Sequence, residues 1–197
     1  TGVVSHRSRI KGIIPFIHFV DGVRTSHEYQ KVACRDYADL ADMLNCDALN
    51  SFRRKSLDPE HPAQRGTAQN PDVFFQAKEA SNKAYDAIPE VVEEYMNKVN
   101  EKIGSDYKLF NYYGAEDADE VIIAMGSVCD TISETVDYLN ANGRKVGLVK
   151  VRLYRPFSVK HLVAAIPSTV KKISVLDRTK EPGSIGEIGR ASCREKD

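Results

Sequence analysis

The chain has 197 residues, which is enough for one full domain and part of another. Its 28 Lys and Arg residues equal its 28 Asp and Glu residues, so no net charge attracts nucleic acid or an anionic membrane. The apolar runs are too short to cross a bilayer, and the chain opens at Thr1 without a signal peptide or an initiating methionine. We therefore expect a piece of a longer cytoplasmic protein with no nucleic-acid and no membrane partner.

The four cysteines form no CxxC pair of the kind that binds zinc or an iron–sulfur cluster. They are Cys34, Cys46, Cys129 and Cys193. Scattered cysteines in a chain of this length indicate reduced thiols rather than a disulfide framework. The histidines are also isolated from other ligand-type residues. The sequence thus predicts no metal site in this chain, and any electron-carrying cluster is expected elsewhere.

Three features precede the middle of the chain. Residues Ile13–Val20 form a short apolar run stopped by Asp21, which predicts a buried strand. Asp36 can cap a following helix, because apolar residues recur with helical spacing as far as Ala48. The polar stretch Ser56–Asn70 contains Pro and Gly, which is typical of a connector between domains.

Two helices are predicted after this connector. Asn70-Pro71 is a start signal, with Asn at the cap and Pro at the first helical position. Pro89 interrupts the helical pattern, and the second helix then continues to Gly104. The residues that share one apolar face of the first helix are Val73, Ala77, Ala80, Ala84 and Ile88.

From Val121 onward, strand and helix patterns alternate. The strands are expected at 121–125, 146–151 and 172–177, and the helices at 127–142 and 158–166. Strands separated by helices of this length imply right-handed crossovers. The sequence therefore predicts an α/β fold, with a parallel βαβαβ sheet covered by helices on both faces.

The turn at 125–130 joins the first of these strands to its helix, where doubly wound folds often bind phosphate. The three-glycine fingerprint is missing, and Ser127 and Asp130 have the spacing of a capping box. A carboxylate at the start of the helix would also repel a phosphate. We therefore favour a structural cap over a nucleotide site.

Arg152, Arg155 and Arg178 follow the carboxyl ends of two predicted parallel strands, which is the usual ligand edge of such a sheet. They could hold an anionic ligand there. Asp177 and Glu181 lie among them, and mixed charges favour an ionic seam against a neighbouring domain. Both interpretations stay open.

Arg24, Thr25 and His27 follow the first predicted strand, and a loop in this position could line a substrate pocket. A helix start capped by Thr25 or Ser26 explains the same residues. Ser26, His27 and Glu28 are consecutive, so they cannot converge as a hydrolase triad.

Six sequence strings, taken together and in this order, resemble the long single-chain pyruvate:ferredoxin (flavodoxin) oxidoreductases. They are Pro15–Glu28 (PFIHFVDGVRTSHE), Arg65–Asp72 (RGTAQNPD), Tyr112–Glu116 (YYGAE), Ile123–Ser127 (IAMGS), Val149–Phe157 (VKVRLYRPF) and Val175–Gly183 (VLDRTKEPG). The resemblance runs from Thr1 to about Glu187.

The resemblance implies a parent protein of anaerobic metabolism that oxidises pyruvate with thiamine diphosphate, Mg²⁺, iron–sulfur clusters of the 4Fe–4S type and coenzyme A. Electrons would pass to ferredoxin or flavodoxin, and the parent would be a homodimer. Residues 1–55 would be the end of a pyrimidine-binding-type domain of the thiamine diphosphate enzymes. Residues 56–70 would be a connector, and residues 71–187 would form a domain similar to the carboxy-terminal domain of transketolase. The family's main pyruvate, diphosphate and cluster contacts would lie outside this chain, so we expect the isolated chain to bind no cofactor and to be inactive.

Residues 188–197 depart from the apolar strand with which the family would continue, and Glu187–Ala191 matches a translated sequencing adapter. We expect 188–197 to be a disordered, non-native tail. The alternative function is a free-standing α/β module that binds an anionic ligand or a protein partner through Arg152 and Arg178.

Overall fold

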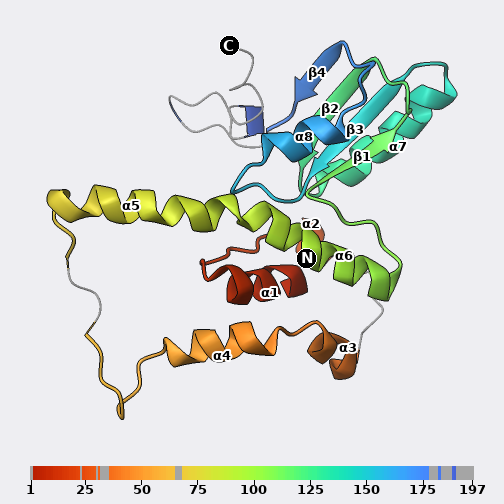
Figure 1. Cartoon of the computed structure of the whole chain (residues 1–197). Helices are drawn as coiled ribbons and strands as arrows, with labels where there is room; N and C mark the ends of the chain where they lie inside the picture. Colours follow the sequence, from red (N-terminus) through yellow and green to blue (C-terminus); the bar gives the residue numbers. More distant parts are fainter. Residues whose placement is uncertain are drawn as a thin grey trace. The chain divides into compact units, whose positions relative to one another are not determined.

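The computed structural model describes residues 2–22, 24–29, 31, 36–64, 68–177, 182 and 188–189. The chain divides into two compact units (Figure 1): Thr1–His18 with Val32–Ser105, and Phe19–Lys31 with Asp106–Asp197. The division falls after Ser105, whereas a connector was expected at 56–70. None of the helices in the described part of the chain is long and apolar enough to span a membrane.

The first unit is helical. Its helices are α1 (Gly2–Gly12), α3 (Tyr37–Asp42), α4 (Cys46–Arg54), α5 (Pro71–Asp86) and α6 (Ile88–Ile103). The central element is α6, whose buried apolar residues are Ile88, Val92, Tyr95 and Met96. Helix α1 packs against α6 and α4. A Cβ at Gly12 would overlap the Ile88 side chain, so the end of α1 approaches α6 closely. This contact explains why α6 joins the first unit.

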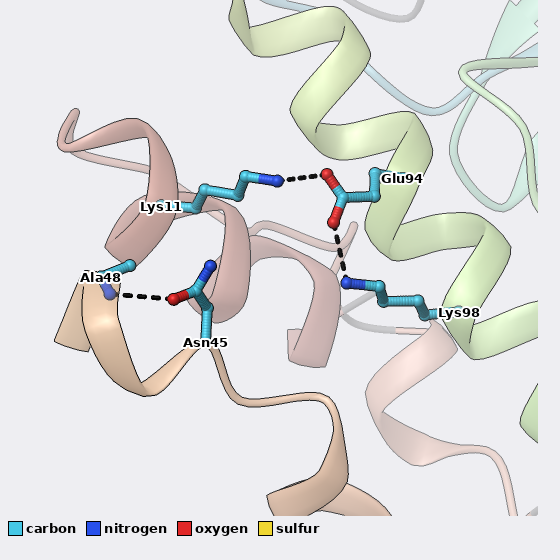
Figure 2. Close-up of polar contacts among 5 residues, drawn as sticks. All are labelled: Lys11, Asn45, Ala48, Glu94 and Lys98. Carbon is cyan, nitrogen blue, oxygen red and sulfur yellow. Dashed lines mark hydrogen bonds and ion pairs between the residues drawn. The ribbon is translucent and has the colours of Figure 1, made fainter.

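Charged contacts fix the helices around α6. Figure 2 shows Glu94 accepting hydrogen bonds from Lys11 of α1 and from Lys98, the latter at 2.7 Å. Lys102 donates to Asp42 of α3 at 2.7 Å. Partly exposed ion pairs of this kind contribute about 1 kcal/mol or less, so they orient the helices more than they stabilise them.

Two predictions for the first half of the chain were wrong. Ile13–Val20 forms no strand, and the side chain of Ile17 is 86% exposed. A strand needs a ladder partner, and no described residue pairs with this run. The single helix expected after Asp36 is broken, because the Asn45 side chain accepts the Ala48 N–H at 2.9 Å and starts α4 (Figure 2). Of the residues expected on the apolar face of the preceding helix, Ile88 is fully buried but belongs to α6, and no residue of α5 itself is buried.

The second unit contains the sheet. Its elements are α2 (Arg24–His27), β1 (Phe110–Gly114), β2 (Glu120–Met125), α7 (Val128–Ala141), β3 (Val146–Val151), α8 (Val159–Ala165) and β4 (Lys172–Val175). The strand order is β1-β3-β2-β4; β3, β2 and β4 are parallel, and β1 is antiparallel to β3. The α/β fold and its three parallel strands are confirmed. The antiparallel edge strand β1 was not predicted.

The helices cover both faces of the sheet, as expected. The chain moves from β2 to β3 through α7 and then back past β2 to β4 through α8 (Figure 1). Because crossovers between parallel strands are right-handed as a rule, this reversal places α7 and α8 on opposite faces. On the α7 face, Ala124 and Leu148 pack against Val136, and all three are fully buried. Burial of both faces is typical of a parallel sheet.

The start of the expected tail is packed instead. Ile188 is 2% exposed, and the N–H groups of Ile188 and Gly189 donate to the Asp177 carboxylate at 2.9 and 3.0 Å. The prediction that the tail is disordered from residue 188 is therefore wrong at its first two residues. Residues 190–197 lie outside the described residues.

We predict that Leu148→Ala lowers the free energy of unfolding of the sheet unit by about 2–5 kcal/mol, because it leaves a cavity in a fully buried site. Denaturant-dependent hydrogen exchange of the β2 and β3 amides would measure this unit separately from the helical one. Val163→Ala, which truncates a side chain that is 63% exposed, is the control and should change the value by about 0.5 kcal/mol or less. Equal effects of the two substitutions would contradict the assigned core.

Candidate functional site

The sheet topology selects one edge as the candidate site. Met125 at the end of β2 lies in register with Val151 at the end of β3, and their helices leave on opposite faces. In doubly wound folds, ligands bind at such a switch point, beyond the carboxyl ends of the two strands. The residues that follow are Gly126 and Ser127 after β2, and Arg152 after β3. Gly126 has φ +86°, a conformation that favours glycine.

The start of α7 is occupied by a carboxylate from a distant part of the chain. Asp21 accepts a hydrogen bond from the Ser127 N–H at 3.3 Å and another from the Ser127 hydroxyl. The hydroxyl of Ser127 lowers the pKa of the Asp21 carboxyl from its ordinary value. The predicted capping box is wrong, because the Ser127 side chain makes no cap bond and contacts Asp21 instead. The helix start that would suit a phosphate is thus filled by an acidic side chain.

The three pocket candidates lie on α2, just beyond Asp21. The Thr25 hydroxyl donates to the Asp21 carboxylate at 3.3 Å. His27 is exposed, and its Nδ1 lies 3.1 Å from the Ser26 hydroxyl. The helix begins at Arg24, so neither Thr25 nor Ser26 is its cap, and the Arg24 side chain lies outside what the structure describes. A hydrogen bond therefore connects Thr25 to the Asp21–Ser127 contact. The described hydrogen bond of His27 is with Ser26 instead.

The candidate arginines have different surroundings. Arg152 donates from Nε to Asn111 Oδ1 at 2.8 Å, and its guanidinium lies 4.7 Å from the centre of the Tyr107 ring. Arg155 instead stacks on its neighbour Tyr154, at 5.1 Å. Arg178 lies outside the described residues.

Sequence reasoning missed Asp21 and Asn111 as parts of this edge. Asp21 was interpreted only as the end of a strand, and its contact with Ser127 joins residues 106 positions apart. Asn111 carries no motif and becomes informative only once β1 is placed beside β3. No local pattern could have signalled either contact.

The described cysteines offer no reactive centre at this edge. Cys129 is 6% exposed, and burial raises the pKa of its thiol, which keeps it protonated and unreactive near neutral pH. Cys46 is exposed on α4 of the other unit. Cys34 and Cys193 lie outside the described residues. Among the described side chains, no group of His, Cys, Asp and Glu could hold a metal ion.

We predict that Ser127→Ala raises the pKa of Asp21 toward its ordinary value, because the strongest hydrogen bond to the carboxylate is lost. A carboxyl ¹³C NMR titration would measure this pKa. Because folding lowers the pKa of Asp21, the contact stabilises the fold at pH values above the unfolded-state pKa of this carboxyl. The stabilisation is lost as the pH falls through the folded-state pKa.

Thr135→Ala is the matched control for this titration. It removes another α7 hydroxyl, which donates to the Thr131 carbonyl at 2.9 Å, and it should leave the pKa of Asp21 unchanged. An Asp21 pKa that is the same in the wild type and in Ser127→Ala would show that the contact does not form in solution.

Two family models match consecutive parts of the chain. Residues 3–97 match the thiamine diphosphate-binding model of pyruvate flavodoxin/ferredoxin oxidoreductase. Residues 118–195 match pyruvate:ferredoxin oxidoreductase core domain II. The first match extends beyond the expected connector at 56–70, and the second reaches into the segment 188–197. The gap between the two matches contains the junction of the compact units at Ser105.

The curated relatives carry the same family names. The pyruvate-flavodoxin oxidoreductase of Enterobacter agglomerans is 62% identical over 184 residues, which cover 93% of this chain and 16% of the relative. The pyruvate:ferredoxin oxidoreductase of Moorella thermoacetica is 54% identical over 185 residues, again 16% of its length. Among solved structures, 2-oxoglutarate:ferredoxin oxidoreductase from Magnetococcus marinus aligns with a TM-score of 0.37 and 26% identity, covering 59% of this chain and 18% of that one. The chain thus spans 16% of the length of these two curated relatives, and it belongs to the pyruvate:ferredoxin (flavodoxin) oxidoreductase family.

Proposed function

We propose that this chain is a segment of an oxidoreductase that decarboxylates pyruvate oxidatively to acetyl-coenzyme A and passes the electrons to ferredoxin or flavodoxin. The observation that carries the proposal is the 62% identity to a pyruvate-flavodoxin oxidoreductase over 93% of the chain. The order of the two family matches along the chain supports it. The partners of the segment are then the remaining domains of the longer protein, which we propose to be a cytoplasmic homodimer.

The intact protein would use thiamine diphosphate, Mg²⁺, iron–sulfur clusters and coenzyme A. The described residues of this chain offer no site for a metal ion and no open helix start for a diphosphate at α7. They contain no cluster of metal-binding side chains, and the Asp21 carboxylate occupies the start of α7, where it would repel a diphosphate. Other parts of the protein would therefore hold the cofactors, and the isolated chain would be inactive.

The segment would act as a scaffold for a pocket formed with other domains. Asp21 ties α2 to the carboxyl edge of the sheet, and α2 carries Arg24, Thr25 and His27. We propose these three residues as contacts of an anionic substrate, because Arg and His can carry a positive charge and Thr can donate a hydrogen bond. Arg152, Arg155 and Arg178 would face a neighbouring domain or an anion.

One observation favours a second function. Arg152 is held by two neighbours at the ligand edge of the sheet, which suits a free-standing module that binds an anion. Such a module would bind its ligand without the rest of an oxidoreductase. Activity in the context of a full-length relative distinguishes the two functions.

We predict that residues 1–187 of this chain can replace the matching segment of the Enterobacter agglomerans enzyme. Pyruvate-dependent reduction of a viologen dye with coenzyme A should stay within about tenfold of the parent, because a segment that misplaced the active site by about 1 Å would cost about 100-fold. The isolated chain, assayed in the same way with thiamine diphosphate, should show no turnover.

A chimera that carries its clusters but has lost activity would contradict the proposed function. Iron content and thermal stability serve as the controls for correct assembly. Turnover by the isolated chain would contradict the proposal that the cofactors are held elsewhere.

A further inference from the structure

The backbone around Arg152 is fixed by the strand next to it. The N–H groups of Arg152 and Leu153 both donate to the Leu109 carbonyl, at 3.0 and 3.3 Å. Leu109 is 1% exposed and Leu153 is 8% exposed, so this anchor is part of the core. The base of the Arg152 side chain therefore has a defined position.

The guanidinium of Arg152 is held as well. Its Nε donates to Oδ1 of Asn111, which also accepts the Lys108 N–H at 2.9 Å. Asn111 is 6% exposed, and its Nδ2 donates to the Asp106 carbonyl at 2.6 Å and to the Asp106 carboxylate at 3.4 Å, so both ends of this buried amide are bonded. The Tyr107 ring stacks on the guanidinium at 4.7 Å. Few rotamers remain available to the Arg152 side chain, which lowers the entropy that a ligand would have to remove.

The charge of Arg152 has no acidic partner in the described part of the chain. Other cations of the same unit do have one: Arg144 and Lys172 pair with Glu120 at 2.8 and 3.0 Å, and Lys145 pairs with Asp117. Arg152 forms no ion pair with any described carboxylate, and its side chain is exposed. Its Nε is engaged by Asn111, and the four N–H groups on its two terminal nitrogens are left to bind an acceptor.

We propose that Arg152 is a binding site for an oxyanion, either a carboxylate or a phosphate. A planar, fixed guanidinium offers two parallel N–H donors that match both groups. The position agrees, because Arg152 directly follows β3 at the switch point of the sheet. The inference deepens the anion role suggested for Arg152 above. It concerns binding by this chain itself, so its failure would leave the oxidoreductase assignment untouched.

The test is an NMR titration of the Arg152 Nε–H resonance in the whole chain. Inorganic phosphate, acetate and chloride are added separately at constant ionic strength. If only phosphate produces a saturable shift of the resonance, Arg152 is a phosphate site. If acetate also produces a saturable shift, the site is open to protein carboxylates as well. Equal, non-saturating shifts with all three ions would overturn the proposal, since they would show only screening.

Variants separate the fixed geometry from the charge alone. Arg152→Lys keeps the charge but loses the planar fork and the Nε–H signal, so its titration follows the backbone amide of residue 152. Binding of the saturating ion should weaken about tenfold. Tyr107→Leu should weaken it less, because Asn111 still holds Nε. Arg144→Lys is the matched control, since Arg144 is paired with Glu120 at 2.8 Å, and it should leave the affinity unchanged. Equal loss of affinity in Arg152→Lys and Arg144→Lys would overturn the proposal. If a variant fails to fold, the titration of the wild-type chain still decides.

Discussion

The parallel pairing of β2 with β3 is the constraint on which the sheet unit depends. It aligns Met125 with Val151, so the turn after β2 and the chain after β3 leave the sheet side by side. The chain then reverses direction across the sheet, which puts α7 and α8 on opposite faces and creates one switch point. The position of every candidate residue after β2 and β3 follows from this pairing. The apolar side chains that α7 and the sheet bury against each other hold it in place.

Charge at that edge is distributed unevenly. Asp21 fills the start of α7, where an anion from outside would otherwise find N–H donors. Arg152, at the same edge, is held by Asn111 and Tyr107 and forms no ion pair with a described carboxylate. Within the proposed oxidoreductase, the first contact would fix the α2 segment on the sheet, and the second would accept an anionic group. Both are positioning and binding roles, and neither involves a group of described side chains that could hold a metal ion.

The βαβαβ part of the fold could be predicted because β2, α7 and β3 bury their own periodic apolar patterns within this chain. The Ile13–Val20 run could not, because an apolar pattern shows that a segment needs burial but not whether a partner strand is present. The apolar pattern of α5 likewise did not show whether a partner is present, and no residue of this helix is buried. At the site, Arg152 was identifiable from its place after a strand. Asp21 and Asn111 were not, because their partners lie 106 and 41 residues away.

The most direct test of this account is the order of the strands, measured by inter-strand NOEs in the labelled chain. Val149 of β3 should show NOEs to Tyr112 of β1 on one side and to Ile123 of β2 on the other. That result would place the switch point between β2 and β3, beside Ser127 and Arg152. NOEs that join β1 directly to β2, or β3 directly to β4, would contradict the account, because the two turns would then no longer share an edge.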